Sequence, residues 1–191
     1  MPAIPRQAFA AAFVALLLPN QSPATTVPCL DLPELVHGSE RIVHARVVRH
    51  WSDWDAAHRI IWTHYLLDVK DSLKGHSSPD VRISEPGGTA GETMMKVEGV
   101  TEYYDGEEVV VFLHRTPIGY WRCYGWGQGK YSVTQAAGGP KRIRTNLSGL
   151  AFIDRPGPSG PLRPAANLPL NRLDGMTLQE FEQLVLREAN R

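Results

Sequence analysis

The chain lacks any net charge. Its 191 residues include 20 Lys and Arg against 20 Asp and Glu, which gives a formal net charge of +0 at pH 7. Nucleic acids and anionic membrane surfaces attract proteins with a marked positive balance, so we expect neither as a partner. Long apolar runs are also scarce. Beyond residue 24 none approaches the ~20 residues that a transmembrane helix needs, so we expect no membrane span.

Familiar catalytic motifs are missing too. There is no Gly-x-Ser-x-Gly elbow, no phosphate-binding glycine loop and no His-Glu-x-x-His pair. His44 and His64 fall on predicted strands, opposite the apolar face, so we interpret them as solvated surface side chains. A metal cluster assembled in space stays open. The sequence itself indicates no catalytic residue, no cofactor and no metal ligand.

The first 24 residues have the pattern of a secretory signal. Arg6 provides the positive charge, residues 8–18 form a short apolar run, and Ser22-Pro23-Ala24 supplies the small residues of a cleavage site. The run is too short to cross a bilayer. We therefore expect cleavage after Ala24, a mature chain that begins at Thr25, and a secreted or periplasmic location.

Cysteine is rare, with only 2 residues, Cys29 and Cys123. Both lie in the expected mature chain, and in an oxidising compartment two cysteines most simply form one disulfide. The alternatives are a metal site or a reactive thiol, but no Cys or His sits at ligand spacing beside either residue. The sequence predicts a Cys29–Cys123 bridge.

Alternating strands dominate the middle of the chain. Residues 31–38 read as a short helix with Asp31 as N-cap. Apolar alternation or buried apolar runs, separated by Gly and Pro turns, then predict strands at 41–51, 59–69, 80–84, 107–115, 119–124 and 130–135. The fold class is therefore all-β and mainly antiparallel, a small barrel or sandwich over residues 25–150.

The C-terminal part changes in composition. Residues 151–175 are rich in Pro and Gly and read as a linker or a surface segment. Residues 176–190 read as an amphipathic helix, because Thr177 and Glu180 form a capping box and the apolar residues fall on one face. We expect one barrel domain, a linker and a C-terminal helix, in a monomer.

Aromatic residues near turns are the candidates for binding a partner. Trp51 and Trp54 flank a predicted turn, where flat rings can form a platform for a sugar or a peptide. Core packing or capping of the barrel ends is the alternative. Gly87 and Gly88 belong to the loop from Pro86 to Gly91, which we interpret as a flexible inter-strand loop and a possible contact surface.

An ordered set of motifs resembles a known family. Cys29 precedes a short helix, followed by Glu40–Val48 (ERIVHARVV), Val69–Gly75 (VKDSLKG) and Gly106–Leu113 (GEEVVVFL). This order resembles the netrin-like module, the OB-type barrel of tissue inhibitors of metalloproteinases. It is also similar to secreted bacterial proteins with a Pro-Gly-Gly loop and a Gln-Gly-Lys-Tyr-like end, here Gln128–Tyr131.

The resemblance implies an OB-like barrel over about Cys29 to Val133, and protease inhibition as a possible activity. In those inhibitors the N-terminal cysteine chelates the protease zinc through its amine and carbonyl. That role passes to Cys29 only if Cys29 is the mature N-terminus. Cleavage after Ala24 leaves four residues ahead of it.

The sequence thus favours a secreted, non-enzymatic binding module of the cell envelope or exterior. Its partner would be an extracytoplasmic protein or glycan, with a metalloprotease as one candidate. One alternative is a structural envelope protein that docks through its C-terminal segment. The other is a hydrolase with a site assembled from scattered residues such as His64, Glu102 and Tyr104.

Overall fold

The computed structural model describes residues 24–154 and 163–191. The expected signal peptide, residues 1–24, lies outside the described residues except for Ala24. Strands account for 47% of the structure and helices for 17%. In the described part, no helix combines the length and the apolar character that crossing a membrane requires.

Five strands close into the OB-like barrel that the sequence predicts. Around the barrel the order is β7-β2-β3-β4-β8, and β8 pairs back onto β7. Only the β4–β8 contact, Ile83 to Trp121, is parallel. The strands are β2 (Arg41–Trp54), β3 (Ile61–Lys74), β4 (Asp80–Pro86), β7 (Glu108–Arg115) and β8 (Trp121–Cys123).

Alternate side chains of these strands fill the barrel, as the period of two requires. One core cluster occupies this interior, and it is formed mostly by aliphatic residues of β2, β3, β4 and β7. Its buried members are Val43, Ala45, Val47, Tyr65, Leu67, Val81, Ile83, Tyr103, Val109, Val111, Leu113 and Cys123.

A second core lies on the outer face of β2 and β7, beneath the two helices. Phe112, Tyr131 and Phe181 meet there, with ring centroids 4.5 to 6.3 Å apart. Both helices, α1 (Leu32–Gly38) and α2 (Leu178–Ala189), begin with a capping box. Both contribute buried residues to this cluster. The α2 helix is thus part of the core.

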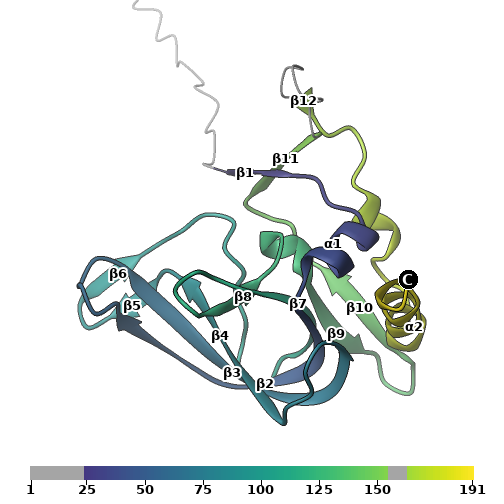
Figure 1. Cartoon of the computed structure of the whole chain (residues 1–191), viewed down its shortest axis with the longest axis horizontal. Helices are drawn as coiled ribbons and strands as arrows, with labels where there is room; N and C mark the ends of the chain where they lie inside the picture. The colour runs from purple at the N-terminus through teal and green to yellow at the C-terminus, as the bar shows by residue number, and fades with distance from the viewer. Residues whose placement is uncertain (1–23, 155–162) are drawn as a thin grey trace, which may run out of the picture.

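The remaining elements flank the barrel (Figure 1). Both helices lie at one side, and the hairpin of β5 and β6 lies at the opposite end. The segment expected as a linker contributes most of β11, all of β12 and a short 3₁₀ helix. The bounds are β1 (Thr25–Pro28), β5 (Gly88–Ala90), β6 (Thr93–Met95), β9 (Lys130–Gln135), β10 (Lys141–Thr145), β11 (Leu150–Asp154) and β12 (Arg163–Pro164), with 3₁₀ helices η1 (Trp126–Gly129) and η2 (Pro169–Arg172).

The predicted Cys29–Cys123 disulfide is wrong, because both cysteines are free thiols. Cys123 is 4% exposed inside the barrel, and its Sγ lies 3.0 Å from the carbonyl oxygen of Trp126. Cys29 follows β1, and its amide donates a hydrogen bond of 2.9 Å to the Ile153 carbonyl. The Cys29 Sγ is 4.0 Å from the Asn167 carbonyl oxygen. Strand pairing therefore holds the two sulfurs in different surroundings.

Candidate functional site

A cavity of about 600 Å³ opens at the barrel end that carries the β5–β6 hairpin. Its walls are the end of β2, the start of β3, the end of β4, the hairpin and the segment 96–104. We call it the mouth groove. It is lined by His50, Trp51, Ser52, Thr63, Tyr65, Glu85, Pro86, Gly87, Gly88, Thr89, Met94, Met95, Lys96, Val97, Val100, Glu102, Tyr103 and Tyr104.

Gly87 and Gly88 seat the hairpin against β2 and β3. Their φ angles are 107° and 125°, a region that side chains rarely adopt. A Cβ atom on Gly88 would collide with the hydroxyls of Ser52 and Thr63. The two hydroxyls are 2.9 Å apart, and Thr63 Oγ1 donates to the Gly87 carbonyl at 2.7 Å. The two glycines thus let the hairpin close one wall of the groove.

Trp51 lies in the mouth groove, but Trp54 does not. The Trp51 ring is half-buried, 5.4 Å from the His64 ring and 5.0 Å from the Arg49 guanidinium. Trp54 instead stacks on His58 at 5.5 Å, beside the β2–β3 turn. Three of the four predicted contact residues therefore meet in one cavity.

A buried carboxylate lies deep in the groove. Glu85 is 2% exposed and accepts hydrogen bonds from the Cys123 amide at 2.7 Å and from Arg122 Nε at 3.0 Å. Burial raises the pKa of Glu85 to about 7, against the opposing effects of Arg122 and the Cys123 amide. Glu85 can therefore change its protonation near neutral pH.

Two tyrosines pack beside this carboxylate. The Tyr65 and Tyr103 rings are 4.9 Å apart, and the Lys130 ammonium lies 4.8 Å from the Tyr103 ring. The Tyr103 hydroxyl is buried beside the Cys123 thiol, and burial is the main reason why the pKa of Tyr103 is raised well above its ordinary value. The inner groove thus places a buried carboxylate beside two packed tyrosine rings.

The outer rim of the groove carries two large exposed side chains, a methionine and a tyrosine, among polar and charged neighbours. Met94 on β6 is 76% exposed and Tyr104 is 66% exposed. Large apolar side chains of a soluble protein are more often covered, and neighbouring exposed ones mark contact surfaces. Methionine also adapts readily to the shape of a partner.

The scattered residues of the hydrolase alternative do not come together in the groove. Glu102 and Tyr104 line it, but His64 does not. The Nδ1 atom of His64 instead lies 2.8 Å from the Ser84 hydroxyl, between β3 and β4. Ser84 is only 1% exposed, so this pair offers no accessible nucleophile.

Sequence reasoning missed the floor of the groove and, at its rim, Met94. The burial of Glu85 could have been predicted from the sequence. Val81, Ile83 and Glu85 alternate along β4 and therefore share its inward face. The positions of Met94 and Tyr103 could not have been predicted, since they depend on how the hairpin and the segment after it fold back over the barrel.

Comparison of the chain with family models, curated proteins and solved structures gave no match. The resemblance to the netrin-like module stays a prediction.

Proposed function

We propose that the protein is an extracytoplasmic binding module that holds a segment of a partner protein in the mouth groove. The observation that carries the proposal is the pairing of an open cavity of about 600 Å³ with exposed Met94 and Tyr104 at its rim. Pockets that combine apolar walls with a few directed polar groups are the usual form of binding sites. The extracytoplasmic location rests on the sequence of residues 1–24.

A protein segment suits the groove better than a glycan does. Sugar binding needs an open aromatic face, whereas the Trp51 ring already packs against Arg49 and His64, and the Lys130 ammonium lies 5.8 Å from the Tyr104 ring. Flexible Met94 and Met95 add adaptable apolar surface, which favours a side chain of a partner protein over a hydroxyl-rich ring.

The zinc-chelating inhibitor mechanism is not part of the proposal. It requires a free amine on Cys29, but residues Thr25–Pro28 precede it as β1 and pair with β11. The Cys29 nitrogen donates to the Ile153 carbonyl at 2.9 Å. If the netrin-like resemblance reflects common ancestry, we infer that the barrel is shared and that the binding surface differs.

A displayed peptide library tests the proposal directly. Peptides selected on the full chain should lose affinity when Met94→Ser and Tyr104→Ala are combined, because both side chains form the rim. A loss of about 30-fold, or ~2 kcal/mol, is expected for residues that dominate an interface.

Ile118→Ser is the matched control. Ile118 is 63% exposed but lies in the β7–β8 turn, outside the groove, so its removal should leave peptide affinity unchanged. Equal losses in both variants, or selected peptides indifferent to both, would refute the groove as the binding site. If the protein binds members of a glycan panel but no peptide, the partner is a glycan and not a protein segment.

A further inference from the structure

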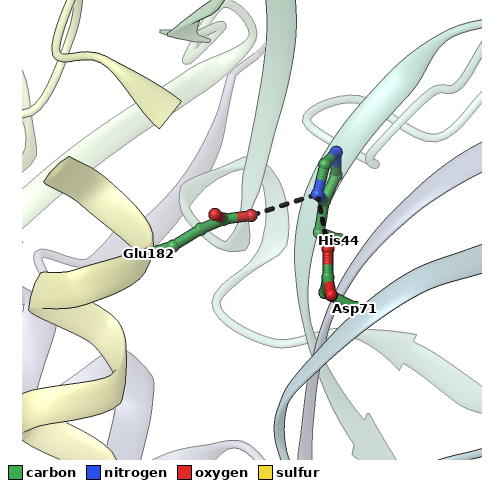
Figure 2. A group of neighbouring side chains, drawn as sticks. All are labelled: His44, Asp71 and Glu182. Atoms are coloured by element: carbon green, nitrogen blue, oxygen red, sulfur yellow. Dashed lines mark ion pairs between the residues drawn. The ribbon is translucent and has the colours of Figure 1, made fainter. Parts of the chain in front are cut away.

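A histidine on the opposite side of the molecule is buried against two carboxylates. The sequence predicts His44 as a solvated residue of a strand face, but it is only 6% exposed because α2 covers this part of β2. His44 pairs across the strands with Asp71 of β3. Glu182 reaches the same ring from α2 (Figure 2). Two neighbouring strands and a helix that is distant in the sequence thus meet at one imidazole.

The far side of the imidazole is fixed by a third carboxylate. His44 Nε2 lies 2.7 Å from Glu108 Oε1, and Lys141 Nζ lies 2.6 Å from the same oxygen. Arg46 donates to the other Glu108 oxygen at 3.1 Å. An ionised carboxylate only accepts hydrogen bonds, so Nε2 is the donor. The lone pair of a neutral His44 is therefore on Nδ1, which faces Asp71 and Glu182.

The Nδ1 atom has close oxygen neighbours but no hydrogen bond. Glu182 Oε1 is 3.0 Å away and Asp71 Oδ2 is 3.6 Å away. Both Nδ1 and Glu182 Oε1 are nevertheless buried without a hydrogen-bond partner among the described residues. The oxygens thus lie near Nδ1 without lying along its bonding direction. Among the described residues, neither Asp71 nor Glu182 forms an ion pair with a lysine or arginine.

This arrangement suits a metal ion. A cation bound by Nδ1 lies along the direction of its lone pair. The other ligand atoms must therefore lie to the side of that direction. Ligand atoms about 2.0–2.2 Å from a tetrahedral Zn²⁺ ion are roughly 3.4 Å apart. The distances from His44 Nδ1 to Glu182 Oε1, 3.0 Å, and to Asp71 Oδ2, 3.6 Å, lie on either side of this value. The three ligand atoms all lie within 4.8 Å of one another. Glu108 completes the usual pattern, in which a carboxylate holds the second nitrogen of a ligating histidine.

We propose that His44, Asp71 and Glu182 bind a divalent transition-metal ion of the Zn²⁺ class, which fastens α2 to the barrel. Imidazole nitrogen with carboxylate oxygens suits zinc, whereas calcium and magnesium prefer oxygen ligands alone. The Asp71 side chain is 66% exposed, which gives the ion an entry path and leaves room for a water ligand. The site is independent of the mouth groove.

Zn²⁺ titration of the chelator-treated full chain tests the site. We expect one Zn²⁺ per chain by calorimetry and a rise in the thermal unfolding midpoint. Asp71→Asn and Glu182→Gln keep the side-chain size and remove a ligand charge. Each should weaken Zn²⁺ binding by more than the ~10–100-fold expected for Glu108→Gln, which disturbs only the outer contact.

Asp68→Asn is the matched control, because Asp68 lies on the same strand and pairs with Lys70 instead. It should bind Zn²⁺ as the wild type does. Co²⁺ bound to the wild-type chain provides a second readout, since its visible absorption reports tetrahedral coordination whether or not the variants fold. Absent absorption, a lack of stoichiometric Zn²⁺, or undiminished binding by folded Asp71→Asn and Glu182→Gln would overturn the proposal. Those outcomes would make His44 part of an ion-pair cluster.

Discussion

The helix-covered face and the mouth groove bury opposite kinds of side chain. Beneath α1 and α2, Phe112, Tyr131 and Phe181 are 0% exposed and pack ring against ring. In the groove the barrel buries a carboxylate, Glu85, and exposes a methionine and a tyrosine at the rim. Apart from the His44 cluster, the helix-covered face follows the ordinary rule of apolar burial, whereas the groove departs from it.

The difference separates the part that stabilises the fold from the part that can recognise a partner. Proteins depart from local rules mainly at functional sites, because a buried charge and exposed apolar groups reduce stability. Changes beneath the helices should therefore affect folding, and changes at the rim should affect binding.

The largest expected effect comes from Phe181→Ala. Phe181 is fully buried between Phe112 and Tyr131, and its truncation leaves a cavity that the rings fill only partly. We expect a loss of about 3–5 kcal/mol in the free energy of unfolding. Tyr104→Ala at the exposed rim should change it by less than about 0.5 kcal/mol. Guanidinium denaturation of both variants measures the two effects.

Comparable losses in the two variants would abolish the distinction between the regions. A small effect of Phe181→Ala would mean that α2 is docked weakly on the barrel and contributes little to the core.

The groove should contribute a pH dependence of stability through Glu85. The pKa of Glu85 is raised from 4.5 to about 7, so the folded state binds more protons than the unfolded state between these values. Stability relative to Glu85→Gln should therefore fall as the pH rises from about 4 to about 8, by up to ~3 kcal/mol. Phe181→Ala should lower stability by the same amount throughout this range. Denaturation at several pH values gives both curves.

The prediction is contradicted if the wild type becomes more stable relative to Glu85→Gln as the pH rises. This result would show that Arg122 and the Cys123 amide keep Glu85 ionised in spite of its burial.

Much of the fold could be predicted from the sequence, because most elements are determined by the pattern of residues within the element itself. The apolar run of β7, the alternation of β2 and the capping box at Thr177 each indicate their element without tertiary information. The burial of His44 could not be predicted. Its polar face of β2 is covered by α2, which lies more than a hundred residues away in the sequence.

The groove was only half predictable for the same reason. Trp51 and the Gly87-Gly88 pair stand out as turn residues, and the structure brings them together. Tyr103 and Met94 join them only because the hairpin folds over the barrel end. Distance between chain segments also explains the disulfide error, because composition gives the number of cysteines and not their separation.

The smallest expected effect concerns the cysteines, which would tie the barrel interior to β1 if they were bonded. Cys29→Ser should change the free energy of unfolding by less than about 0.5 kcal/mol, whereas loss of a native disulfide typically costs about 2–5 kcal/mol. Burial raises the pKa of the Cys123 thiol to about 12, so this thiol should resist alkylation until the chain unfolds. Mass spectrometry after alkylation in denaturant without reductant should find both thiols labelled. If labelling requires a reductant, the two cysteines form a disulfide after all, and this bond connects the barrel interior to the segment after β1.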